Sequence, residues 1–311
     1  MRHSVRRVFY KQVPVEKRCD GKTVVVIGAS TGIGQELAKQ LVDRGANVVW
    51  AARSLAKLHE NSQKHGGGEV LQLDLASLNS IKKFAVELKS TISRLDCIVL
   101  NAAYEGAKRR TIDGFDYTFG VNHLGHMYLV HELLDLLRVS APCRVVVVSS
   151  DFHRLASGVR FHDLMWDKTD DRPQFGWPCY NHSKLCNLLF ARELTKKLQG
   201  TGITVNTAHP GSPVRTEIGK SDLVYGNVLL RNVIHPLQIM FSRSSAEGAQ
   251  TLLHCVLDER NVEEATPSPA AQDDEAAKRL WLESCRLLQI SPNWEKLLKA
   301  AAPNNEKPTE E

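Results

Sequence analysis

The stretch Thr23-Val24-Val25-Val26-Ile27-Gly28-Ala29-Ser30-Thr31-Gly32-Ile33-Gly34 decides how this chain folds. Its first half is a run of β-branched residues, which is typical of a parallel strand buried on both faces. Three glycines follow with the spacing G-x-x-x-G-x-G, which allows a sharp turn and close approach to a pyrophosphate. A helix is expected from Gly32 to Arg44, and its free N–H groups and dipole would favour that anion. The stretch therefore predicts a dinucleotide-binding turn, with a purely structural glycine turn as the alternative.

Strands and helices alternate along the rest of the chain. Apolar runs predict strands at 22–27, 47–52, 70–73, 97–100, 144–149 and 203–207. Apolar spacing predicts further helices at 54–65, 78–92, 115–137, 178–198, 246–256 and 274–288. This alternation implies an α/β fold, a doubly wound (Rossmann) parallel sheet with helices on both faces. We therefore expect a single Rossmann-type domain over 21–290, a basic arm over 1–20 and a disordered polar tail over 301–311.

The basic residues are concentrated at the N-terminus. The 311 residues carry a net charge of +5, and residues 1–22 contain seven Lys or Arg against two Asp or Glu. The rest of the chain is balanced, so no nucleic-acid partner is expected. The arm can be a solvated tail, a contact with an anionic membrane surface or a mitochondrial-type transit peptide. We expect a location in the cytoplasm or peripheral to a membrane, with mitochondria as the alternative, since no apolar run is long enough to predict a spanning helix.

The seven cysteines are scattered without a C-x-x-C pair, and we expect them to be reduced and mostly buried. His123, His126 and His131 belong to one expected helix but do not share one face well. No Cys or His pair has the spacing of a zinc site. We therefore expect no metal.

The motif Tyr180-Asn181-His182-Ser183-Lys184 places a tyrosine and a lysine on one face of an expected helix. The ordinary pKa of tyrosine is about 10, and a nearby ammonium and a positive nicotinamide would lower it. Tyr180 could then exchange a proton with an alcohol or a carbonyl while a hydride moves. Ser149 and Ser150 follow the preceding strand, where a hydroxyl would hydrogen-bond the substrate oxygen. A surface helix with an ion pair is the alternative for the motif.

The end of the second strand bears on the choice of dinucleotide. A carboxylate at this place would bind the ribose 2′-hydroxyl of NAD, but the chain has Ala51-Ala52-Arg53. Arg53 could hold a 2′-phosphate with two hydrogen bonds, so NADP(H) is favoured over NAD(H). A surface arginine is the alternative. Asp74, after the third strand, could contact the adenine or hold a turn, and Asn101 ends the fourth strand at the expected ligand crevice.

Together these motifs resemble the short-chain dehydrogenase/reductase family over residues 20–290. The resemblance implies a catalytic tetrad of Asn122, Ser150, Tyr180 and Lys184. It further implies that Asn122 bends its helix to hold a water that relays protons to Lys184, and that Lys184 binds the nicotinamide ribose. The cofactor-binding residues that it implies are Gly28, Ser30, Thr31, Gly32, Ile33, Gly34, Arg53, Asp74, Leu75, Asn101, Ala102, Tyr180, Lys184, Pro210, Gly211 and Thr216.

Within that family the chain is similar to the retinol dehydrogenase and WW-domain oxidoreductase branch. The similarity is carried by Asp151-Phe152-His153-Arg154, Phe161-His162-Asp163-Leu164, His182-Ser183-Lys184-Leu185-Cys186-Asn187 and Ala208-His209-Pro210-Gly211. It implies hydride transfer between NADP(H) and a small hydrophobic substrate, an alcohol or carbonyl of the retinoid, steroid or fatty aldehyde class. Four aromatic residues before the tyrosine helix could line a lipid-sized pocket or be ordinary packing: Phe161, Trp166, Phe175 and Trp177.

Three positions depart from the family pattern. Ile27 replaces a threonine, Ala103 replaces a glycine, and the turn from Gly211 to Thr216 is one residue longer. They motivate a second hypothesis, a cofactor-binding scaffold or sensor with little turnover. The apolar segment 223–241 is expected to be a substrate lid, a membrane-touching segment or a pocket wall. A peripheral membrane contact and a homo-oligomer are left open.

Overall fold

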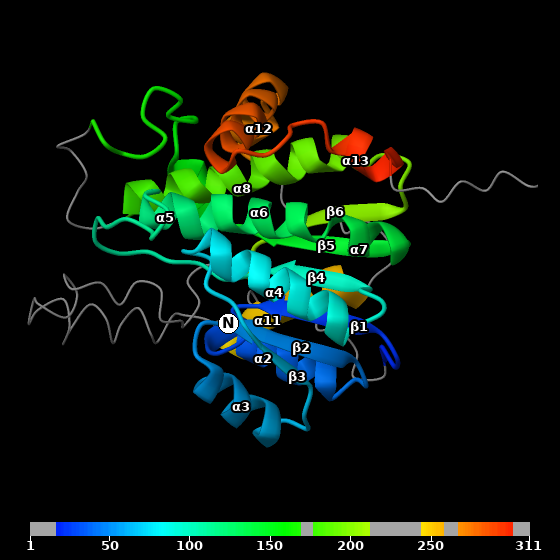
Figure 1. Cartoon of the computed structure of the whole chain (residues 1–311). Coiled ribbons are helices and arrows are strands. Elements are labelled where there is room, and N and C mark those ends of the chain that lie inside the picture. Colours follow the sequence, from blue (N-terminus) through cyan, green and yellow to red (C-terminus); the bar gives the residue numbers. More distant parts are fainter. Residues whose placement is uncertain (1–16, 169–176, 212–243, 258–266, 301–311) are drawn as a thin grey trace, which may run out of the picture.

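The predicted doubly wound sheet is present in the computed structural model, which describes residues 17–168, 177–211, 244–257 and 267–300 (Figure 1). Its parallel strands lie in the order β3-β2-β1-β4-β5-β6. They are β1 Thr23–Ile27, β2 Asn47–Ala52, β3 Glu69–Gln72, β4 Cys97–Leu100, β5 Cys143–Val148 and β6 Ile203–Ala208. Fold class and strands are therefore confirmed, and no predicted strand boundary differs by more than one residue.

The central position of β1 follows from side chains that are apolar on both faces. Val26 pairs with Trp50 of β2 and with Val99 of β4, and all three side chains are buried. The carboxyl ends of the parallel strands meet at one edge, and the strand order reverses between β1 and β4. That reversal is where doubly wound sheets bind ligands.

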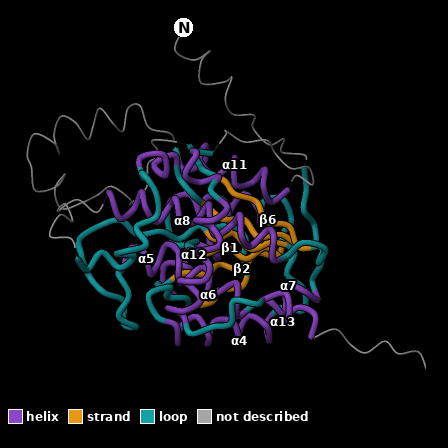
Figure 2. Tube along the Cα trace, turned by 90° about the horizontal axis from the view of Figure 1, so that it is seen from above, coloured by secondary structure: helices purple, strands orange, loops and turns teal. Residues whose placement is uncertain are grey.

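Helices cover both faces of the sheet (Figure 2). Alternate residues of β1 pack into two cores, because successive side chains of a strand point to opposite faces. Val24 and Val26 share one core with side chains of α2 (Gly32–Val42), α3 (Leu55–Lys64) and α11 (Ser245–Leu257). Val25 and Ile27 share the other core with α4 (Leu78–Thr91), α6 (Gly125–Glu132) and α8 (Trp177–Lys197).

The helix predicted at 115–137 is divided into four segments. These are α5 (Tyr117–Phe119), a π-helical segment η1 (Gly120–Leu124), α6 and α7 (Leu134–Val139). Asp116 caps the start, because its carboxylate accepts a hydrogen bond from Phe119 N at 2.9 Å. At the end of η1 the Gly125 N–H bonds to the Gly120 carbonyl, five residues back. This π-type bond spans one residue more than the hydrogen bond of an α-helix. Asn122 therefore lies in a π-helical turn, and the bend implied at Asn122 stays a prediction.

The packed body extends past residue 290, the domain end that the sequence predicts. After η4 (Pro269–Gln272), α12 (Asp274–Leu288) packs against α8, and α13 (Trp294–Ala300) follows. The Trp294 ring contacts Trp281 of α12 with ring centroids 4.5 Å apart, and Leu298 is also buried. The sequence reasoning did not include α13, because a helix of seven residues offers little apolar periodicity.

Several predicted features lie outside the described residues: most of the basic arm, segment 223–241, Thr216, Phe175 and the tail at 301–311. Among the described helices, none is long and apolar enough to cross a membrane. All seven cysteines are buried free thiols, as the sequence predicts.

Candidate active site at the carboxyl edge of the sheet

The glycine turn after β1 is locked to the end of β4. Gly28 has φ +85° and Gly32 has φ +62°, which are backbone angles that favour glycine. A Cβ atom on Gly28 would lie 2.8 Å from the Cα of Ala102. The Asn101 side-chain amide donates to the carbonyls of Ile27 at 3.2 Å and Gly28 at 3.4 Å. The two strand ends at the reversal of the sheet therefore form one rigid surface.

The first turn of α2 has the properties of an anion site. Thr31 is the N-cap residue, and its side chain makes no capping hydrogen bond to the helix. The first N–H groups of a helix have no partner within the helix, and here they begin directly after the glycine turn. The Ser30 carbonyl is held by the Asn61 amide at 3.0 Å, which fixes the loop. Ser30, Thr31 and the glycine turn therefore fit a dinucleotide pyrophosphate.

Arg53 follows β2 at the same edge. Its Nη1 donates to the Tyr117 hydroxyl at 3.0 Å, and its carbonyl accepts from the Gln72 side chain at 3.0 Å. The Arg109 guanidinium stacks on the Tyr117 ring, 3.5 Å from the centroid. Two arginines therefore meet at one tyrosine, an arrangement with the charge to hold a phosphate.

Asp74 and Leu75 lie behind this edge. The Asp74 carboxylate accepts from Ala76 N at 3.0 Å, so it holds a turn, which is one of its two predicted roles. Leu75 is buried against Gly125, where a Cβ atom would lie 2.6 Å from the Leu75 carbonyl oxygen. Leu75 therefore packs against the residue that follows the π-helical segment.

Tyr180 and Lys184 are both buried on α8, at 6% and 1% exposure. The Lys184 Nζ atom lies 5.5 Å from the centroid of the Tyr180 ring and donates to the Val148 carbonyl at 3.1 Å. The Ser150 hydroxyl lies beside the Tyr180 phenol and acts to lower its pKa. The adjacent Ser149 instead donates to the Lys184 carbonyl at 2.8 Å. Of the two serines, Ser150 is thus the one that meets the phenol.

Burial controls the ionisation of this pair. It raises the pKa of Tyr180 to about 12, opposed by the Ser150 hydroxyl and reinforced by the Glu105 carboxylate. Burial also lowers the pKa of Lys184 to about 8. The sequence reasoning expected an ammonium to lower the pKa of the phenol. In the protein chain itself the pKa is raised, because desolvation of the phenolate outweighs the opposing effect of the Ser150 hydroxyl.

Asn122 connects three elements in the interior. Its side-chain oxygen accepts from Tyr104 N at 2.7 Å, and its amide donates to the Tyr104 carbonyl and to Ser183 Oγ, each at 2.9 Å. Ser183 in turn donates to the Tyr180 carbonyl at 2.7 Å. Asn122 thus fixes the loop after β4 to the helix of Tyr180. The sequence reasoning missed Ser183, because a serine beside Lys184 has no pattern that separates it from ordinary helix residues.

Two aromatic side chains stand beside the phenol. Phe152 lies with its ring centroid 6.4 Å from that of Tyr180, and Trp177 lies 6.2 Å from Tyr180. Of the three aromatics considered from the sequence that the structure describes, Trp177 is the one placed here. Trp166 packs on His182 and under Arg160, and Phe161 stacks with Arg279. Phe152 was missed, because its position depends on the 3-10 turn η2 (Asp151–Leu155) that follows Ser150.

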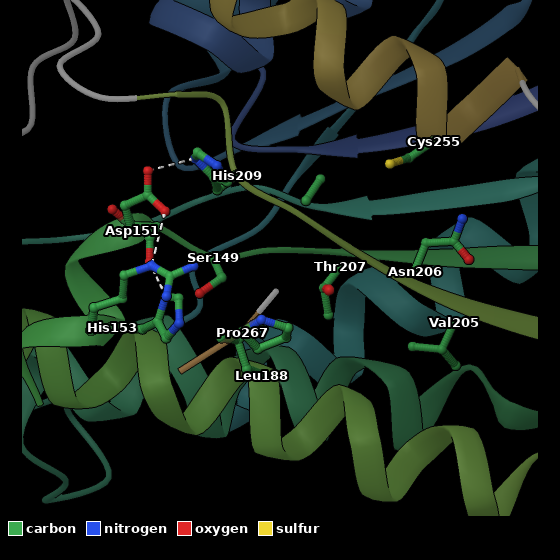
Figure 3. Close-up of a pocket in the computed structure, with 13 residues that line it drawn as sticks. Ser149, Asp151, His153, Leu188, Val205, Asn206, Thr207, His209, Cys255 and Pro267 are labelled. Atoms are coloured by element: carbon green, nitrogen blue, oxygen red, sulfur yellow. Dashed lines mark hydrogen bonds and ion pairs between the residues drawn. The ribbon is translucent and has the colours of Figure 1, made fainter. Parts of the chain in front are cut away.

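A cavity of about 350 Å³ adjoins Ser150 on the β6 side (Figure 3). Asp151 and His153 line it from η2, and Thr207 and His209 line it from β6 and the residue after it. The His209 ring lies 3.5 Å from the Asp151 carboxylate. Pro210 and Gly211 follow, with Gly211 at φ +86° and its N–H donating to His209 Nδ1 at 3.1 Å. The predicted Pro-Gly turn therefore lies at this same edge.

Comparisons with known proteins agree with this architecture. Residues 22–159 match the sequence model of the family described as short chain dehydrogenase. The chain is 40% identical to retinol dehydrogenase 12 of Homo sapiens over 94% of each chain. It is 37% identical to retinol dehydrogenase 13 of Homo sapiens, over 89% of this chain and 87% of that one. A solved structure of an uncharacterized protein from Mycobacterium Paratuberculosis is 28% identical with a TM-score of 0.70, covering 90% of this chain and 99% of that chain.

Proposed function

Because the chain belongs to the short-chain dehydrogenase/reductase family, we propose that it interconverts a hydrophobic alcohol and its carbonyl compound, with NADP(H) as cofactor. Family membership makes the protein an NAD(P)-dependent oxidoreductase that acts on alcohols. The preference for NADP(H), the hydrophobic substrate and the residue roles that follow are our proposal.

One observation carries the assignment of the site. The buried phenol of Tyr180 lies beside the Ser150 hydroxyl at the carboxyl edge of the sheet, where the glycine turn after β1 also lies. A proton donor and an oxygen-binding hydroxyl at the same edge as a turn that fits a dinucleotide support this assignment. An alcohol–carbonyl interconversion needs this combination.

The cofactor, when bound, supplies or accepts the hydride. In the reduction direction Tyr180 donates its phenolic proton to the carbonyl oxygen of the substrate. A pKa of about 12 keeps that proton on the phenol until it is needed. Ser150 hydrogen-bonds the same substrate oxygen and stabilises the charge that develops on it. Lys184 returns a proton to Tyr180 and would hold a ribose hydroxyl of the cofactor.

The preference for NADP(H) is supported by the second strand. No carboxylate follows β2, where it would select the free ribose of NAD. Arg53 stands there instead and is anchored to the Tyr117 hydroxyl, with Arg109 stacked beside it. We assign Arg53 to the 2′-phosphate.

The hydrophobic substrate is supported by the surroundings of the phenol and by the relatives. Phe152 and Trp177 flank Tyr180 and offer an apolar contact surface. Proteins with 37% and 40% identity to the chain are named retinol dehydrogenases. A retinoid, a steroid or a fatty aldehyde fits this chemistry.

The decisive experiment mixes the purified protein with NADPH and a panel of retinal, long-chain aldehydes and steroid ketones, and follows the loss of NADPH absorbance. We expect oxidation of NADPH with at least one member. Tyr180→Phe should abolish turnover while cofactor binding stays nearly intact. Cofactor binding without turnover across the whole panel would contradict the proposal and favour a scaffold or sensor.

A further inference from the structure

His126 is a buried histidine in the first turn of α6, with 2% exposure. Its Nδ1 atom lies 3.2 Å from the main-chain carbonyl of Asn122. A carbonyl oxygen only accepts hydrogen bonds, so Nδ1 must carry the ring proton. The other ring nitrogen, Nε2, is then a bare acceptor. It is buried and has no hydrogen-bond partner among the described residues.

The surroundings of His126 keep its ring neutral. Burial is the largest cause that lowers its pKa to about 3, and the Lys184 ammonium on α8 is close enough to lower it further. His123 on η1 is the titratable neighbour on the other side, and burial lowers its pKa to about 3 as well. The Nε2 lone pair is therefore available at any pH at which the enzyme works.

The π-helical segment explains why the imidazole reaches this carbonyl. The bond from Gly125 N–H to the Gly120 carbonyl shifts the hydrogen-bond pattern of the helix by one residue. The Asn122 carbonyl is then met by the His126 side chain, while the Asn122 side chain is held by Tyr104 and Ser183. Both the main chain and the side chain of Asn122 are thus fixed by hydrogen bonds.

We propose that His126 is a positioning residue of the proton relay behind Tyr180: its Nδ1–H fixes the Asn122 carbonyl, and its Nε2 accepts a hydrogen bond from the water that recharges Lys184. This inference rests on the proposed function. In reduction, the Tyr180 phenolate takes a proton from the Lys184 ammonium. The resulting amine takes a proton from solvent through that water. The imidazole of His126 neither gains nor loses a proton.

The test uses a pair of variants, each of which removes the role of one of the two ring nitrogens. His126→Asn keeps a donor near the place of Nδ1 but loses Nε2, and His126→Gln places a polar atom near Nε2 but loses the Nδ1 donor. In steady-state reduction with NADPH, we expect kcat to fall about tenfold in each variant and more in His126→Phe. The solvent deuterium isotope effect on kcat should rise, and the dissociation constant for NADPH should stay within about twofold of the original.

His123→Asn is the matched control. It also removes a buried imidazole, one that is hydrogen-bonded to Ser284 Oγ at 2.9 Å. It should lose thermal stability without a change in the isotope effect. The inference is overturned if the folded His126 variants keep the original kcat and isotope effect, or if His123→Asn changes the isotope effect equally. Should His126→Phe fail to fold, the Asn and Gln variants decide the matter. Full activity of Tyr180→Phe would instead overturn the proposed function itself.

Discussion

The hydroxyl of Ser149 donates a hydrogen bond to the main-chain carbonyl of Lys184 over 2.8 Å. This bond ties the end of β5 to the helix that carries Tyr180 and Lys184. The next residue, Ser150, meets the phenol. Two adjacent serines therefore have separate tasks, one in holding the helix and one at the proposed reaction centre.

Substitutions at these two serines should separate stability from activity. Ser149→Ala removes a buried hydrogen bond between the end of β5 and α8 and should lower the free energy of unfolding by about 0.5–1.5 kcal/mol. Ser150→Ala should lower kcat by about a hundredfold or more, since it removes the hydrogen bond to the substrate oxygen. It should cost less stability than Ser149→Ala, because the Ser150 side chain accepts only a part-buried bond of 3.3 Å from Phe152 N. Urea unfolding and NADPH oxidation measure the two effects. An inactive Ser149→Ala beside a fully active Ser150→Ala would reverse the assignment.

Arg53 provides the second prediction. If its guanidinium holds a 2′-phosphate, Arg53→Ala should weaken binding of NADPH by about 10- to 100-fold, as expected for a charge-assisted hydrogen bond, and leave NADH binding nearly unchanged. Tyr117→Phe removes the hydroxyl that accepts from Arg53 at 3.0 Å and should give a smaller loss. Calorimetric titration with both cofactors measures the ratio. Equal losses for NADPH and NADH would mean that Arg53 is an ordinary surface arginine.

Glu105 provides the third prediction. Its carboxylate raises the pKa of Tyr180, because a negative charge nearby disfavours the phenolate. Alcohol oxidation needs the phenolate, so its rate should rise with pH. Glu105→Gln removes the charge at nearly constant shape and should move the pH profile of kcat/KM for oxidation to lower pH. A profile that stays in place, or moves to higher pH, would show that Glu105 does not act on the phenol.

The strands and the edge of the sheet could be predicted because their causes are local. The run Val24–Ile27 has to be buried on both faces, and a glycine such as Gly28 is needed where the chain turns beneath Ala102. These two requirements select apolar residues in the strand and a glycine after it, and this composition can be recognised in the sequence. Right-handed crossover connections then place helices on both faces of the sheet.

The remainder of the site depends on contacts between distant segments. Phe152 reaches Tyr180 only after η2 forms, and Ser183 matters only because Asn122 lies across from it. No characteristic residue pattern predicts the π-helical segment, because a single altered hydrogen bond creates it. Burial is the largest cause that raises the pKa of Tyr180 in the chain itself, and burial cannot be seen in a helix motif.

Acid stability provides the fourth prediction, which rests on three buried neutral histidines. Burial lowers the pKa of His123 and His126 to about 3 and that of His182 to about 4. In the unfolded chain these rings titrate near the ordinary value of about 6.5. Below that value the unfolded chain binds protons that the folded protein does not bind. Stability is therefore fully present above about pH 6.5 and is lost as the pH falls toward 4.

Each of these histidines should contribute a slope of about 1.4 kcal/mol per pH unit within that window. Urea midpoints measured between about pH 7 and 5 should fall accordingly. His182→Phe keeps an aromatic ring against Phe119, 5.9 Å away, but removes a titrating group. It also leaves the Arg160 N–H without its acceptor, so overall stability drops. The pH slope of that variant should nevertheless be smaller by about 1.4 kcal/mol per pH unit, because one titrating ring is gone. An unchanged slope would mean that His182 is solvated and titrates normally in the folded protein.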